Sequence, residues 1–181
     1  MPDEPKSQGK LVPSFPPSVR IDPDVLEEEA RDCYQAAIFY NIYPHEELKS
    51  LVYIRSSGEA EGVAKVSTRF VMTHVPGDLY VDEIVLNQIV GQCRLAPDAV
   101  LRERGLERGR VNPWTAQFYI GRDITHVVSS LVLVLKDVYT NDDTLTGRSI
   151  FNPRELEHLL NPFLEYEIAT NVRPKRSAWR L

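Results

Sequence analysis

Cysteine is scarce in this chain of 181 residues, and no metal-binding pattern accompanies it. The two cysteines, Cys33 and Cys93, stand far apart and lack the spacing of a zinc knuckle. The four histidines include no His–x–x–x–His pair. We therefore expect no metal site and no cofactor.

Long apolar runs are absent as well. No stretch reaches the roughly 18–20 apolar residues of a membrane span, and the first residues do not follow the pattern of a secretory signal. Together with the low cysteine content, these absences favour a protein of the reduced cytoplasm that has no membrane partner.

Positive charge is in the minority, with 21 Lys and Arg against 26 Asp and Glu and a formal net charge of −5. Non-specific binding to nucleic acid depends on neutralising phosphates with Lys and Arg. The balance therefore argues against a protein that coats nucleic acid. It leaves room for a small basic surface, for which the candidates are Lys65, Arg108, Arg110 and the basic segment from Arg173 to Arg180.

The length and a hydrophobic content of 43% fit one compact domain. Residues 1–20 contain five prolines, and we expect them to form a flexible arm that could contact a synthetase or another protein. Residues 21–172 are expected to form the domain, and residues 173–181 a basic tail. The oligomeric state stays open.

Helical and strand patterns alternate within the expected domain. The patterns predict helices over 22–40, 82–90 and 97–104 and from Asn152 onward, and strands over 66–74, 126–139 and 163–172. The apolar run 126–139 is long enough for one bent strand or for two strands, and it is the expected centre of the sheet. This interleaving predicts an α/β fold of the mixed α+β kind: a single domain with a central mixed β-sheet flanked by helices.

A Gly–x–x–x–Pro loop from Gly109 to Pro113 is the most informative local feature. Glycine lets the backbone approach a ligand closely, and proline fixes the exit of the turn. The loop follows the helix expected over 97–104 and precedes strongly apolar stretches. We therefore expect it to lie between regular elements and to face a ligand.

With its neighbours, this loop resembles the YbaK/ProX family of aminoacyl-tRNA editing domains, which hydrolyse wrongly charged tRNA. Phe39–His45 resembles the family's opening strand and its histidine-containing turn, Gly62–Lys65 the segment that presents its essential lysine, and Asn141–Gly147 a late turn before the last helix. The resemblance covers approximately residues 36–172. In the family, threonine or serine and then leucine usually follow the lysine, and a serine commonly precedes the loop proline. Here Val66 follows Lys65, and Asn112 precedes Pro113.

The resemblance implies a free-standing hydrolase that deacylates mischarged aminoacyl-tRNA. It implies catalytic roles for Lys65 and Gly109, and substrate contacts for His45, Arg110, Val111, Asn112, Pro113, Asn141 and Gly147. Because an aminoacyl ester is already activated, such a hydrolase needs chiefly a positioned water and stabilisation of the oxyanion. Backbone N–H groups of the Gly109 loop could stabilise the oxyanion, Lys65 could hold a phosphate or the carbonyl, and a ribose hydroxyl could orient the water.

Other interpretations stay open. The same fold could bind an aminoacyl or nucleotide-like ligand without hydrolysing it, as a regulatory or biosynthetic accessory. Lys65 could also be an ordinary exposed lysine at a strand end. The Ser129–Ser130 pair lacks the glycines of a nucleophile elbow, so we expect core hydroxyls there, and Asp142–Asp143 is typical of a turn.

Overall fold

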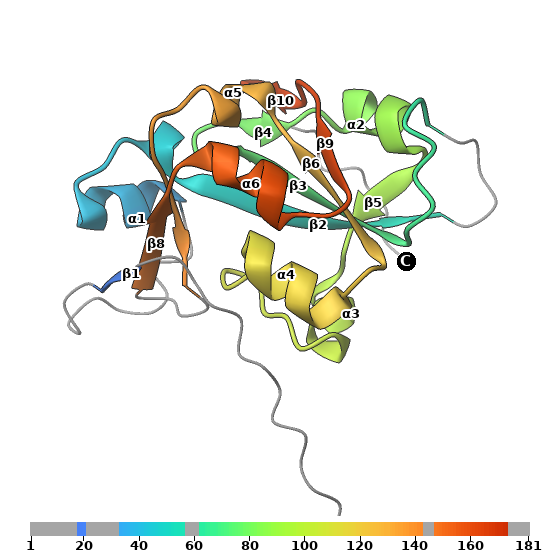
Figure 1. Ribbon diagram of the computed structural model, residues 1–181, viewed down its shortest axis with the longest axis horizontal. Helices are drawn as coiled ribbons and strands as arrows, with labels where there is room; N and C mark the ends of the chain where they lie inside the picture. Colours follow the sequence, from blue (N-terminus) through green and yellow to red (C-terminus); the bar gives the residue numbers. More distant parts are fainter. Residues whose placement is uncertain (1–17, 21–32, 57–61, 143–146, 174–181) are drawn as a thin grey trace, which may run out of the picture.

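The computed structural model describes residues 18–20, 33–56, 62–142 and 147–173 (Figure 1). Most of the expected N-terminal arm, the first part of the helix expected from Asp22, Asp143 and the tail beyond residue 173 lie outside the described residues. The division into arm, domain and tail therefore stays a prediction. Ser18–Arg20 of the expected arm forms strand β1.

A five-stranded sheet forms the centre of the protein. Its strands lie in the order β5 (Cys93–Leu95), β2 (Leu48–Arg55), β3 (Phe70–Pro76), β6 (Ile124–Val128) and β9 (Phe163–Glu165). β2 is antiparallel to both neighbours, whereas β3, β6 and β9 run parallel. The sheet is therefore mixed, and the predicted α+β fold with a central mixed sheet flanked by helices is confirmed.

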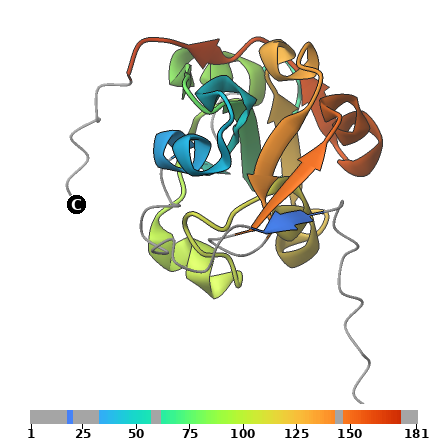
Figure 2. The same ribbon diagram turned by 90° about the vertical axis from the view of Figure 1, so that its left-hand side faces the viewer.

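Two smaller sheets accompany it. β1 and β7 (Val138–Asn141) pair with the two edges of β8 (Gly147–Phe151), and β4 (Tyr80–Val81) pairs with β10 (Ala169–Thr170). A parallel bridge between Glu47 and Tyr139 joins the start of β2 to β7. The β7–β8 ribbon lies beside α1 (Cys33–Tyr40) in both views (Figure 2).

The remaining helices cover the two faces of the central sheet. α3 (Asp98–Glu103) and α4 (Pro113–Ile120) lie on one side, and α2 (Glu83–Val90) lies on the other (Figure 1). The short helices are α5 (Ser130–Leu133), α6 (Leu156–Leu159) and the 3-10 turns Pro44–Glu46 and Pro153–Glu155. Asp82 caps α2 as its sequence predicts: Oδ1 accepts from the backbone N–H of Ile84 at 3.0 Å.

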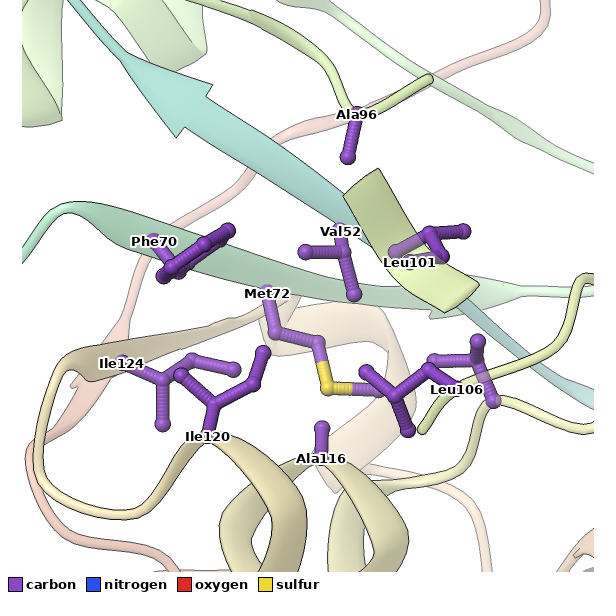
Figure 3. Packing of buried hydrophobic residues seen from close by; sticks show 10 residues of the cluster. Val52, Phe70, Met72, Ala96, Leu101, Leu106, Ala116, Ile120 and Ile124 are labelled. Carbon is purple, nitrogen blue, oxygen red and sulfur yellow. The ribbon is translucent and has the colours of Figure 1, made fainter. Parts of the chain in front are cut away.

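Alternation along the strands divides the core between these faces. Toward α4, Val52, Met72 and Ile124 of three neighbouring strands pack with Ala116 and Ile120 (Figure 3). The intervening residues Tyr53, Val71 and Val127 pack toward α2. All residues of β3 are buried, so β3 is the sheet's central strand.

Of the two alternatives for residues 126–139, the single bent strand was wrong. The run does contain two strands, β6 and β7, and the first ends just before Ser129, but the helix α5 lies between them and they belong to different sheets. Ser129 ends the strand and caps α5, since its Oγ accepts from Leu131 N at 3.2 Å. A short apolar run does not distinguish a strand from a buried helix.

Three other boundaries differ from expectation. The strand expected over 66–74 begins at Phe70, and the run 163–172 forms β9 and β10 in two different sheets. Phe39–His45 is the end of α1 and a 3-10 turn instead of an opening strand. The first strand of the central sheet is β2, which immediately follows.

Candidate functional site

A cavity of about 540 Å³ lies along β2. β5 pairs with β2 only over Tyr53–Arg55. One residue beyond this pairing, Ala96 N donates to Val52 O at 2.8 Å. The cavity begins where this pairing ends. Its wall consists of residues 47–52, of the chain from β5 into α3 (95–98 and 101), of the glycine loop (108, 109 and 111), and of Cys33, Tyr80, Asn141 and Arg148.

Lys49 is the lysine on this wall. Its half-buried side chain donates from Nζ to Leu79 O at 2.6 Å, and Nζ lies 5.1 Å from the centroid of the Tyr80 ring. A lysine ammonium has three N–H donors, so one bond to the protein fixes it while others can point to a ligand. The residues that follow it are Ser50 and Leu51.

The Gly109 loop is held in place by two buried asparagines. Asn112 caps α4, with Oδ1 accepting from Thr115 N at 2.8 Å, and its Nδ2 donates to the backbone oxygen and to Oδ1 of Asn141, both at 3.1 Å. Asn141 returns a bond from Nδ2 to Val111 O at 3.1 Å. Gly109 has a φ of 87°, which favours glycine. The loop is therefore anchored to β7 with Gly109 on the cavity wall.

A buried ion pair closes another part of the wall. Arg148 Nε lies 3.0 Å from Glu47 Oε1, and the two side chains are 3% and 6% exposed. The Arg148 guanidinium also lies 4.8 Å from the centroid of the Tyr40 ring. Burial raises the pKa of Glu47 to about 7 and outweighs the attraction of Arg148, which lowers it. Glu47 Oε2 has no hydrogen-bond partner within the described part of the chain.

The structure brings some of the predicted site residues to the cavity and leaves others away from it. Gly109, Val111 and Asn141 line it. Asn112 and Pro113 are buried behind the loop, and Gly147 begins β8 next to Arg148. Arg110 does not line the cavity, and its guanidinium lies 3.4 Å from Glu107 Oε2. His45 is exposed, and its ring stacks on that of Tyr43 with 5.5 Å between the ring centroids.

Lys65 is not among the residues that line the cavity. It is exposed, it has a φ of 47°, and its backbone N–H donates to Gly62 O at 3.1 Å. Lys49 is the lysine that shares a cavity with Gly109. The sequence carried a signal for it, because Lys49-Ser50-Leu51 has the order of lysine, hydroxyl residue and leucine that is usual in the YbaK/ProX family. Glu47 and Arg148 carried no such signal.

Among the described residues, no group of three or more His, Cys, Asp or Glu side chains could hold a metal ion. Within the same ranges, no helix has the length and apolar character needed to cross a membrane.

Comparison with known proteins shows relationship at the level of the fold. No family model matches the chain, and no curated protein matches it. The hypothetical protein APE2540 is similar at 20% identity and a TM-score of 0.67, over 85% of this chain and 91% of that one. A structure described as "Epitope backbone grafting by computational design for improved presentation of linear epitopes on scaffold proteins" is 18% identical with a TM-score of 0.65, over 86% of each chain.

A third similar structure is described as a "putative trans-editing enzyme for prolyl tRNA synthetase". It is 17% identical with a TM-score of 0.59, over 84% of this chain and 85% of that one. At these identities the likeness shows a shared fold. The chain therefore has the fold of a structure described as a trans-editing enzyme.

Proposed function

We propose that the protein is an aminoacyl-tRNA deacylase that binds the aminoacyl end of a mischarged tRNA in the cavity along β2. The observation that carries this proposal is that a lysine and the Gly–x–x–x–Pro loop line the same cavity, with Ser50 and Leu51 following the lysine. The fold likeness to a structure described as a trans-editing enzyme supports it.

The cavity suits such a ligand in size and in chemistry. Its volume of about 540 Å³ falls within the range of about 300–1,000 Å³ of small-molecule sites. Leu51, Val52 and Val111 give it apolar wall for an amino-acid side chain, and Lys49 and Arg108 give it positive charge for a phosphate. An acidic protein can therefore bind the end of a tRNA through a few contacts.

The polar groups on the cavity wall have separate roles in the hydrolysis. Lys49 holds a phosphate or the ester carbonyl as a point charge, and backbone N–H groups of the Gly109 loop stabilise the oxyanion that develops when the ester is attacked. Glu47 lines the cavity, and its Oε2 is buried without a hydrogen-bond partner among the described residues. Its carboxyl group accepts a hydrogen bond from the α-ammonium group of the amino acid.

Incubation with a panel of mischarged tRNAs tests the proposal, and two lysine variants locate the site. Lys49→Met removes the ammonium but keeps an apolar stem against Tyr80, and Lys65→Met makes the same change on an exposed turn. The wild-type protein should release amino acid. Lys49→Met should release it at least about tenfold more slowly, which corresponds to about 1.4 kcal/mol, and Lys65→Met should match the wild type.

Two outcomes would contradict parts of this proposal, and a third would trace the slow rates to folding. If no tRNA in the panel loses its amino acid although the aminoacyl end binds, the fold serves as a binding module. If Lys65→Met is the slow variant, the cavity along β2 is not the site. If both variants are slow and both have lost thermal stability, folding accounts for the loss.

A further inference from the structure

A chain of hydrogen bonds leads from the cavity into the core. Ser50 Oγ lies 2.9 Å from His74 Nδ1, His74 Nε2 lies 3.0 Å from His126 Nδ1, and His126 Nε2 lies 3.0 Å from Gln117 Oε1. Both histidines are 0% exposed. Ser50 is half-buried and lines the cavity, so the chain has one end on the cavity wall and the other on α4.

Strand register brings Ser50, His74 and His126 together, and Gln117 reaches them from α4. Ser50 and His74 face each other directly across β2 and β3, and His126 lies on the neighbouring strand β6. All three occupy the strand face that packs on α4, alongside Val52 and Met72. The two imidazole rings are nearly parallel, with an interplanar angle of 9°.

The bonds have a direction. An amide oxygen only accepts, so with Gln117 Oε1 at His126 Nε2 that nitrogen carries the hydrogen. Burial lowers the pKa of both histidines and keeps them neutral, and each neutral ring has one donor and one acceptor nitrogen. His74 Nε2–H therefore donates to His126 Nδ1, and the Ser50 hydroxyl donates to His74 Nδ1.

The glycine loop lies on the same side of β2 as this hydroxyl. Val111 packs in one cluster with Val52, which is the next residue after Ser50 on that strand face. Gly109 and Ser50 also line the same cavity. A hydroxyl bonded to a base, a second group orienting that base, and a glycine loop nearby form the arrangement of an activated nucleophile.

We propose that Ser50 is the nucleophile of this cavity, with His74 as its base and His126 and Gln117 as positioning residues, and that it acts on carboxylic esters. This inference names the attacking group for the proposed deacylation and rests on that function for its natural substrate. Reactivity toward small esters does not depend on tRNA.

The reaction balances without any group beyond water. Ser50 Oγ bonds to the ester carbon while its proton moves to His74 Nδ1, and the carbonyl oxygen becomes an oxyanion beside the Gly109 loop. The bond to the leaving oxygen then breaks, and that oxygen takes the proton from His74. Water attacks the acyl-Ser50 through the same steps, releasing the acid and restoring the hydroxyl.

Burial of His74 limits the rate at which it can take the proton from Ser50. A buried imidazolium is costly, and Gln117 offers a neutral oxygen where a carboxylate would stabilise the charge. We therefore expect a slow nucleophile. Gln117→Glu should accelerate acylation and Gln117→Leu should slow it, each by about threefold or more, since a neighbouring carboxylate typically raises a pKa by about 1–3 units and the rate follows part of that change.

A fluorophosphonate reagent tests the nucleophile. Intact-mass analysis of the full chain should show one adduct, and peptide mapping should place it on Ser50. Ser50→Ala should take up none, while Ser67→Ala, at an exposed serine outside the cavity, should label like the wild type. No adduct on the wild type, or an adduct that persists in Ser50→Ala, overturns the proposal.

The Gln117 variants separate a catalytic relay from a structural one. If the hydrogen bonds from Ser50 to Gln117 serve only stability, the wild type, Gln117→Glu and Gln117→Leu will be labelled at equal rates, and the proposal fails. The mischarged-tRNA assay runs on the same proteins. If Ser50→Ala still deacylates tRNA, Ser50 is not the nucleophile, and the proposed tRNA deacylation stands. If Ser50 is labelled but no tRNA is deacylated, the proposed tRNA deacylation is wrong, and the assignment of Ser50 as nucleophile stands.

Discussion

Glu47 is a buried carboxyl on which two strong effects compete, and the sign of its contribution to stability is testable. Burial favours the neutral acid, while Arg148, 3.0 Å away, favours the carboxylate. Burial is the larger effect, and it raises the pKa of Glu47 to about 7 from its usual 4.5. Replacement by Gln keeps the shape of the side chain and removes the titration.

The direction follows from linkage. A carboxyl whose pKa is higher in the folded chain than in the unfolded chain stabilises the fold fully below its unfolded pKa, and this contribution is lost as the pH rises through the folded pKa. The difference between 4.5 and about 7 corresponds to about 3 kcal/mol at about 1.4 kcal/mol per pH unit. The wild type should therefore lose about 3 kcal/mol relative to Glu47→Gln between about pH 4.5 and pH 8.

Urea unfolding of both proteins across this pH range, followed by tryptophan fluorescence, measures the difference. The test is how this difference in the free energy of unfolding changes with pH. The contact of Gln with Arg148 adds a constant to the difference, which is the same at every pH. A difference that stays flat would mean that the pKa of Glu47 is near 4.5 in the folded protein. If the wild type becomes more stable than Glu47→Gln as the pH rises, Arg148 lowers the pKa of Glu47 by more than burial raises it.

Two further predictions concern the loop. Gly109→Ala should slow deacylation by about tenfold or more through displacement of the backbone. Gly121→Ala, at a φ of 72° and outside the cavity, should cost stability by about 1–3 kcal/mol and leave turnover unchanged. Equal deacylation rates of the two variants would remove the loop from the site. Asn112→Ala removes the α4 cap and a partner of buried Asn141, so urea unfolding should show a loss of about 2–4 kcal/mol. Asn152→Ala, at an exposed cap, should lose about 1 kcal/mol or less. Equal losses would mean that the Asn112–Asn141 hydrogen bonds add nothing to the cap.

Capping residues in the sequence predicted where some of the helices begin. Asp82 before an amphipathic run marked α2, and Asn152-Pro153 marked the start of the turn that leads into α6. α4 was missed because Trp114, Ala116 and Ile120 bury it on several sides, so its sequence has no polar face to reveal the helical period. Pro113 was interpreted as the exit of a loop, yet it is also the first residue of that helix.

The candidate site depended more on long-range pairing. The glycine loop was visible in the sequence, and the structure places Gly109 on the cavity wall, although its catalytic role stays a prediction. The Glu47–Arg148 pair and the Ser50–His74 contact arise from strand register, which single-residue patterns do not reveal. Lys49 was overlooked because β2 itself was not expected.

The alternation of β2 connects the proposed roles of Lys49 and Ser50. Lys49 points toward Tyr80 and Leu79, whereas Ser50 points toward His74 and the α4 side, because successive residues of a strand face opposite ways. Where a strand has paired neighbours on both sides, the sheet separates residues on its two faces. Here β5 has ended, and one cavity reaches both. A ligand across this open edge can place its phosphate on the lysine side and its ester on the serine side. The proposed roles of both residues require that β2 keeps its register with β3, since a slip by one residue would exchange their faces.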